Sequence, residues 1–242
     1  MIWFDEIGST NDEAMKRARE GTPEGFIVAA GFQTAGRGRL GRPWQSPRDV
    51  GIYFSIVLRP PTDMMTLIPL MVGIALAETI AELVGADPCV CPIGVKWPND
   101  VLINGKKIAG ILTEAEWKGN EPIVVVGVGV NVTTVLKDLP VRVLYPASSI
   151  MVETGISLDR KVLLQRWKEK FEPLYADMKT HGTTSFTQRW NAWDILKGRP
   201  VRIHTQSGWI EGVGDGIDGD GALFVRKNDG EQVRVLAGDV AP

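Results

Sequence analysis

The chain has 242 residues, of which 44% are hydrophobic and 23% charged, and its formal net charge is −2. This composition is ordinary for a globular protein and excludes an intrinsically disordered or fibrous chain. The length predicts one sizeable core with a small additional domain. The slightly acidic balance excludes nucleic-acid binding through overall positive charge, so any anion-binding site has to be local.

Few residues are available for disulfides or metal ligation. Cys89 and Cys91 are separated by a single residue, which disfavours a mutual disulfide, and with only His181 and His204 besides them a four-ligand zinc site is not expected. The N-terminus lacks the pattern of a signal peptide, and the most apolar segment, 67–77, is shorter than the roughly 20 residues that cross a bilayer. We therefore expect a reduced, cytoplasmic protein with no membrane partner.

The first part of the chain predicts strands that alternate with a helix and a long loop. Residues 2–7 are expected to form a strand, and Thr10 is expected to cap the helix that follows. Segments 26–34 and 52–58 are rich in Ile, Val and Phe and predict two further strands. Residues 35–50, between these strands, have no hydrophobic periodicity, and loops of that length inside a domain are usually functional.

Later segments predict a buried helix, a hairpin and a β-rich tail. Residues 66–84 are apolar nearly all the way round, which indicates a helix covered on several sides. Asn104-Gly105 predicts a tight hairpin between strands at 101–103 and 107–113. Further strands are expected at 95–97 and 123–132, and helices at 159–180 and 183–193. From Pro200 onward short β runs alternate with glycine-rich turns, as in a small barrel or half-barrel.

The most informative stretch is residues 36–42, GRGRLGR, inside the long loop. Its glycines match the dinucleotide-binding pattern G-x-G-x-x-G, but Pro43 and Pro47 prevent the helix that this pattern requires, and no Walker sequence occurs. Glycine permits close approach to a ligand, and guanidinium groups suit carboxylate and phosphate oxygens. A solvated basic loop is the alternative, but Trp44 favours a loop that closes over an apolar ligand.

Other polar residues fit the same kind of site. A hairpin would bring the Asp100 carboxylate near the Lys107 ammonium, although an ordinary exposed hairpin would do the same. Residues 127–131, GVGVN, end an apolar strand, where glycines are costly unless a ligand or another backbone approaches closely. Neutral groups suited to a urea-like or amide head are found at Ser9, Thr10, Asn11 and Gln33. Because no Ser-His-Asp arrangement emerges, the chemistry would rest on positioning and charge stabilisation.

In this order, the motifs resemble those of the biotin protein ligase family. The segments that carry the resemblance are residues 9–11 (STN), 33–42 (QTAGRGRLGR), 96–100 (KWPND), 107–112 (KIAGIL) and 127–131 (GVGVN). The resemblance implies an α+β fold, with a mixed β-sheet catalytic domain flanked by helices over residues 1–190. It also implies a small SH3-like C-terminal β-barrel over residues 197–242.

The resemblance implies an ATP-dependent ligase with Mg²⁺ as its cofactor. Such an enzyme activates biotin to biotinyl-5′-AMP with release of pyrophosphate, and then transfers biotin to a lysine of a biotin carboxyl carrier protein. Many bacterial relatives carry an N-terminal DNA-binding domain, whereas this chain begins at the catalytic domain, so no nucleic-acid partner is expected. An exposed sheet edge would permit a homodimer. A lipoate or octanoate ligase and a nucleic-acid-binding module are the competing interpretations.

The resemblance also assigns roles to individual residues. Arg39 and Lys107 are expected to be catalytic. Biotin is expected to contact Ser9, Thr10, Asn11, Gln33, Gly36, Arg37, Gly38, Arg39, Trp44, Lys107 and Gly110. ATP is expected to contact Arg37, Arg39, Lys96 and Asn131, and Mg²⁺ to contact Asp100.

Overall fold

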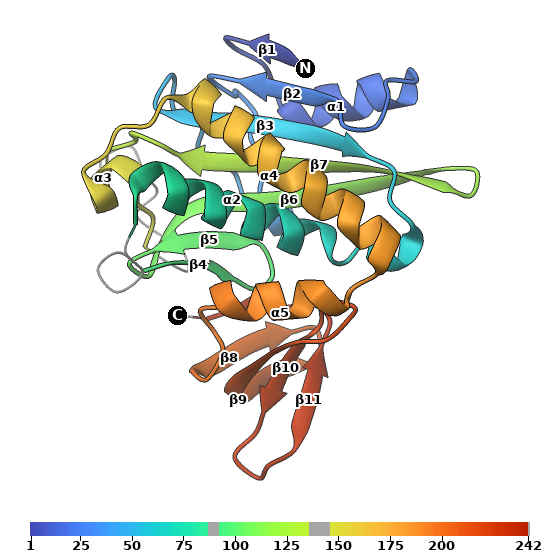
Figure 1. The fold of residues 1–242 in the computed structure, drawn as a ribbon, viewed down its shortest axis with the longest axis vertical. Helices are drawn as coiled ribbons and strands as arrows, with labels where there is room; N and C mark the ends of the chain where they lie inside the picture. The colour runs from blue at the N-terminus through green and yellow to red at the C-terminus, as the bar shows by residue number, and fades with distance from the viewer. Residues whose placement is uncertain (87–91, 136–145, 242) are drawn as a thin grey trace.

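A computed structural model describes residues 1–86, 92–135 and 146–241, so Cys89 and Cys91 lie outside the described residues. Two β-sheets with surrounding helices make up the fold (Figure 1). The strands of the larger sheet are β1 (Ile2–Phe4), β2 (Ile27–Ala30), β3 (Gly51–Leu58), β4 (Ile93–Lys96), β5 (Asp100–Ile103), β6 (Lys106–Lys118) and β7 (Glu121–Asn131). Their order is β1-β2-β3-β7-β6-β5-β4, and only the β1–β2 pair is parallel, which confirms a mixed sheet.

Helices cover both faces of this sheet. The helices are α1 (Thr10–Arg19), α2 (Ile68–Val84), α3 (Ile150–Thr154), α4 (Arg160–His181) and α5 (Thr184–Trp193), with short 3₁₀ turns η1 (Arg39–Gly41) and η2 (Thr62–Met64). Because side chains alternate across a strand, Ile27 and Ala29 join the core beneath α2 and α4, whereas Val28 packs with Ala14 of α1. Helix α2 is buried over most of its circumference, as its apolar sequence predicts. In the described parts of the chain, no helix has the length and apolarity that crossing a membrane requires.

The start of α1 differs from the prediction. Ser9, in extended conformation at φ −149° and ψ 133°, is the N-cap residue, and Thr10 is the first helical residue. The side-chain oxygen of Gln33, which follows β2, accepts hydrogen bonds from the Thr10 backbone N–H at 2.8 Å and from the Thr10 hydroxyl at 3.0 Å. The predicted cap at Thr10 is wrong, because a residue distant in sequence supplies the acceptor for the first N–H of the helix, which has no partner within the helix.

The predicted hairpin between β5 and β6 is confirmed. Asn104 and Gly105 have φ values of 52° and 74°, so both turn residues adopt the left-handed conformation that a two-residue type I′ hairpin needs. The hairpin pairs Asp100 with Gly110 and Ile103 with Lys106. It therefore places Asp100, at the beginning of β5, beside Gly110 of β6, so that two of the predicted motifs lie side by side.

The C-terminal residues form a second, antiparallel sheet. Its strands are β8 (Pro200–Thr205), β9 (Gly208–Ile217), β10 (Leu223–Arg226), β11 (Gln232–Val235) and β12 (Asp239–Val240). They are ordered β11-β10-β9-β8-β12, and the two outer strands are not hydrogen-bonded to each other in the described residues. The β-rich tail is confirmed; over its described residues the sheet is open, which corresponds to the half-barrel and not to the closed barrel.

The two sheets share one hydrophobic core. Val201, Ile203 and Leu223 of the second sheet belong to the same buried cluster as α2 and α4. The Trp97 indole, 1% exposed, donates a hydrogen bond of 3.0 Å to the Gly221 carbonyl oxygen. This packing places the end of the chain beside the long loop between β2 and β3.

Candidate active site

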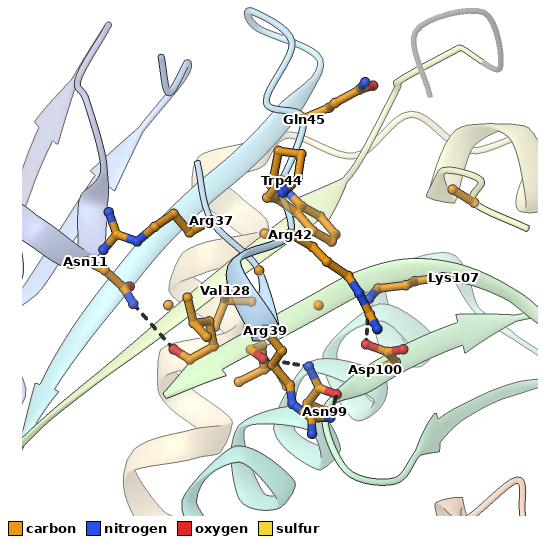
Figure 2. Close-up of a pocket in the computed structure, with 18 of the residues that line it drawn as sticks. Asn11, Arg37, Arg39, Arg42, Trp44, Gln45, Asn99, Asp100, Lys107 and Val128 are labelled. Carbon is orange, nitrogen blue, oxygen red and sulfur yellow. Dashed lines mark hydrogen bonds and ion pairs between the residues drawn. The ribbon is translucent and has the colours of Figure 1, made fainter. Parts of the chain in front are cut away.

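The predicted site residues surround one cavity of about 410 Å³, within the range of small-molecule sites (Figure 2). The predicted residues that line it are Ser9, Thr10, Asn11, Gln33, Arg37, Gly38, Arg39, Trp44, Lys96, Asp100, Lys107, Gly110 and Asn131. Gly36 is the predicted residue outside this lining. A Cβ atom there would lie 2.6 Å from the Trp44 carbonyl oxygen, so glycine at this position lets the loop fold back on itself.

Neutral polar groups meet at one end of the cavity. The Ser55 hydroxyl lies 2.8 Å from Thr10 Oγ1 and 2.6 Å from Asn11 Oδ1, and Thr10 in turn bonds Gln33. The Gln33 amide nitrogen donates to Ser46 Oγ at 3.2 Å. Ser55, which is fully buried and holds these side chains from behind the cavity wall, was not predicted, although a serine among the apolar and aromatic residues of β3 was an available signal. These donors and acceptors suit a neutral, urea-like head group.

Glycines on β6 and β7 make the floor of the cavity. A Cβ atom at Gly127 would lie 2.1 Å from Asn11 Oδ1, and one at Gly129 would lie 2.4 Å from Trp44 Nε1. Gly110, directly opposite Gly129 across the sheet, would meet the Trp44 ring at 2.8 Å. The sequence predicted close approach at these strand glycines, and the structure shows that side chains from α1 and the long loop occupy the space.

The other end of the cavity is charged. Asp100 Oδ1 lies 2.7 Å from Lys107 Nζ, and Asp100 Oδ2 lies 3.4 Å from Lys96 Nζ, so the predicted proximity of Asp100 and Lys107 is confirmed. Burial lowers the pKa of Lys96 from its ordinary 10.5 to about 8, and the nearby Lys107 ammonium acts in the same direction, whereas the Asp100 carboxylate opposes them. Two ammonium groups beside one carboxylate can receive a further anion.

The first arginine of the loop contacts carboxylates on α1 and β6. Arg37 donates to both Asp12 oxygens, at 2.8 and 2.6 Å, and lies 3.3 Å from Glu114 Oε1. These partners raise the pKa of Arg37 further above its ordinary value, mainly through the Asp12 hydrogen bonds. Glu114 also accepts a hydrogen bond of 2.6 Å from the Asn11 amide. Asp12 and Glu114 therefore link the loop to the neutral end of the cavity, a link that sequence periodicity does not indicate.

The other arginines of the loop reach the opposite wall. Arg39 Nη1 donates to Asn99 Oδ1 at 3.1 Å, and Arg39 Nη2 donates to the Gly238 carbonyl oxygen at 3.2 Å. Arg42 Nη2 donates to Asp239 Oδ2 at 2.7 Å. In Figure 2, Arg39 lies beside Asn99, while Trp44 lies above the strand that carries Lys107. Asn99 and the C-terminal residues were missed, because their contacts with the loop are distant in sequence.

Asn131 was predicted to contact ATP and Asp100 to contact Mg²⁺, and the structure shows the surroundings of both side chains. Asn131 is 3% exposed and donates to the Ser148 carbonyl oxygen at 2.9 Å, so its amide is engaged at the cavity wall. Within the described residues, no three His, Cys, Asp or Glu side chains form a metal-binding cluster. Mg²⁺ is commonly held by one or two carboxylates together with substrate phosphates. Asp100, a carboxylate on the cavity wall, could serve as such a ligand.

Comparison with known proteins decides the family. The biotin/lipoate A/B protein ligase family matches residues 3–131, and the biotin protein ligase C-terminal domain matches residues 197–241. The chain belongs to this family as a biotin protein ligase. The predicted family and enzyme class are thereby confirmed.

Individual relatives agree with this assignment. The chain is 35% identical over 227 residues to the biotin–[acetyl-CoA-carboxylase] ligase of Paracoccus denitrificans, covering 93% of each protein. It is 32% identical over 241 residues to the Mycobacterium tuberculosis ligase of the same name, covering 97% of this chain and 86% of the relative. The biotin protein ligase of Aquifex aeolicus in complex with biotin and ATP has a TM-score of 0.82 and 28% identity, covering 99% of this chain and 97% of the other.

Proposed function

We propose that this biotin protein ligase joins biotin to ATP and then transfers the biotinyl group to a lysine of a biotin carboxyl carrier protein. The observation that carries the proposal is a single cavity with neutral hydrogen-bonding groups at one end and Lys96, Lys107 and Arg39 at the other. Such a cavity matches biotin, which combines a urea-like ring with a carboxylate. The names of the relatives support the acceptor, since acetyl-CoA carboxylase is named in both.

In the first step, a biotin carboxylate oxygen attacks the α-phosphorus of ATP, and the bond to the β-phosphate breaks to release pyrophosphate. Thr10 and Gln33 orient the ring, while Lys107 and Arg39 neutralise the carboxylate and the phosphate oxygens that approach it. Two anions repel each other in water, so fixed cations that face both of them lower the barrier. Asp100 would contact Mg²⁺ bound to the phosphates, and the metal would balance further negative charge.

In the second step, the neutral ε-amine of the acceptor lysine attacks the carbonyl carbon of biotinyl-5′-AMP. The bond between that carbon and the phosphate oxygen breaks, AMP leaves, and the attacking nitrogen loses a proton. Lys107 remains placed to stabilise the oxyanion that forms. Trp44 packs over the glycine floor, and a closed loop there would protect the mixed anhydride from hydrolysis.

Mass spectrometry of an apo carrier domain tests the proposal. Incubation with the chain, biotin, ATP and Mg²⁺ is expected to add one biotinyl group to the acceptor lysine. Omission of ATP, or an acceptor in which that lysine is replaced by arginine, is expected to abolish the addition. Transfer of lipoate in preference to biotin, or no addition under saturating conditions, would refute the proposal.

A further inference from the structure

The C-terminal sheet contributes a carboxylate to the cavity of the candidate active site. Strand β12 pairs with β8, yet Asp239 and Val240 of this strand line the cavity. Asp239 Oδ1 lies 3.4 Å from Arg39 Nη1, and Asp239 Oδ2 lies 2.7 Å from Arg42 Nη2. One carboxylate therefore bridges two arginines of the loop, with one oxygen for each guanidinium.

Burial makes Asp239 the fixed member of this group. Its side chain is 16% exposed, compared with 28% for Arg39 and 53% for Arg42. Backbone pairing of Asp239 with His204 holds the carboxylate in the sheet, whereas the arginines belong to a loop without regular strand pairing. The loop side chains are thus held by an anchor from the second sheet.

The bridge leaves the arginines able to bind a substrate. A guanidinium carries five N–H donors, and Asp239 occupies only one oxygen–nitrogen contact with each of the two groups. Arg39 Nη1 also donates to Asn99 Oδ1, and Arg39 Nη2 donates to the Gly238 carbonyl oxygen, so Nε and one N–H of Nη2 remain for a substrate. A long arginine side chain that is already fixed loses less entropy when it binds phosphate.

We propose that Asp239 is a positioning residue, through which the C-terminal sheet holds Arg39 and Arg42 at the phosphate-binding end of the cavity. The proposal rests on the proposed function, because it assigns the arginines to ATP. It also gives the second sheet a part in the reaction: the carboxylate touches no reacting atom, but it sets where the two guanidinium groups point.

Biotin-dependent pyrophosphate exchange by Asp239→Asn tests this role. The KM for ATP is expected to rise about tenfold, the factor that corresponds to one charge-assisted hydrogen bond, with a smaller rise in the KM for biotin, whose carboxylate faces Arg39 but not Arg42. Asp239→Glu keeps the charge and is expected to restore part of the ATP affinity. Glu211→Gln removes a carboxylate paired with Arg202 at 2.8 Å on the same sheet and serves as the matched control. Thermal unfolding of each variant separates this effect from misfolding.

A second comparison examines whether Asp239 acts through the arginines. In a variant that already carries Arg39→Ala and Arg42→Ala, the addition of Asp239→Asn is expected to raise the KM for ATP no further. An unchanged KM for ATP in the single variant would overturn the proposal, and a lowered KM would identify Asp239 as a competitor of phosphate. Absence of exchange in the unaltered chain would instead refute the proposed function.

Discussion

Lys107 and Arg39 are the side chains whose loss we expect to affect the proposed reaction most directly. Lys107→Ala and Arg39→Ala are each expected to slow biotin-dependent pyrophosphate exchange by about a hundredfold, because each removes a cation that stabilises developing charge. The two side chains are 25% and 28% exposed, so little change in thermal stability is expected. Lys106→Ala is the control, because the ammonium of Lys106, next to Lys107 in sequence, pairs with Glu153 and not with Asp100. Exchange at the unaltered rate in both variants would remove the two residues from the mechanism.

We expect Lys96 to make ATP binding sensitive to pH. Its pKa of about 8 means that the ammonium form is lost as the pH rises through that value, so the KM for ATP is expected to increase above pH 8. Lys96→Arg keeps its charge at this pH and is expected to flatten the dependence. The KM for ATP of the unaltered chain and of the variant is measured by pyrophosphate exchange between about pH 7 and pH 9.5. The same pH dependence in the arginine variant would assign the titration to another group.

Burial of Lys96 also affects stability, in a direction that follows from its pKa. The folded state holds this proton less tightly than the unfolded state, whose ordinary pKa is 10.5. Between pH 8 and 10.5 the unfolded chain therefore binds more protons at this site, and the contribution of Lys96 to the free energy of unfolding rises with pH. Below that window the cost of burying the ammonium is fully present. Such a cost is typical of a group kept for function.

The packing of the long loop on strands β6 and β7 depends on glycine. Gly129→Ala would place a methyl group 2.4 Å from Trp44 Nε1, so we expect the indole to be displaced, the biotin affinity to fall, and amide exchange in residues 35–48 to become faster. Gly8→Ala adds a methyl group with no atom within 4 Å and serves as the control. Equal exchange rates and biotin affinities in both variants would show that the loop does not need this contact.

At the level of the elements, the sequence predicted those helices and turns whose conformation depends on residues close by in the chain. The apolar helix at 66–84 and the Asn104-Gly105 hairpin are confirmed, because burial pattern and turn conformation are set locally. The acceptor at the start of α1 could not be found in this way, since Gln33 lies 23 residues after Thr10. Asp239 lies further still from the loop that it contacts, 197 residues from Arg42.

The same reasoning applies to the candidate site. The sequence indicated the residue types for a neutral head group and for anions, and the structure brings nearly all of them to one cavity. The partners that fix these groups, such as Ser55 and Glu114, come from strands whose pairing brings distant segments together. The local sequence pattern could not decide between a closed barrel and an open half-barrel for the C-terminal sheet, because closure depends on whether the first and last strands pair.

The whole molecule is held together by a core that both sheets share, and Trp97 lies at their junction. Trp97→Phe leaves the buried Gly221 carbonyl oxygen without its 3.0 Å hydrogen bond, at a cost of about 1–3 kcal/mol. For a chain of this size we expect a midpoint about 2–12 °C lower in calorimetry, still as one transition, because hydrophobic contact between the sheets remains. Trp209→Phe, at a side chain 51% exposed on the second sheet, is the control and is expected to unfold like the unaltered chain. Two separate transitions, of which Trp97→Phe shifts only one, would mean that the sheets unfold independently and that the shared core does not couple them.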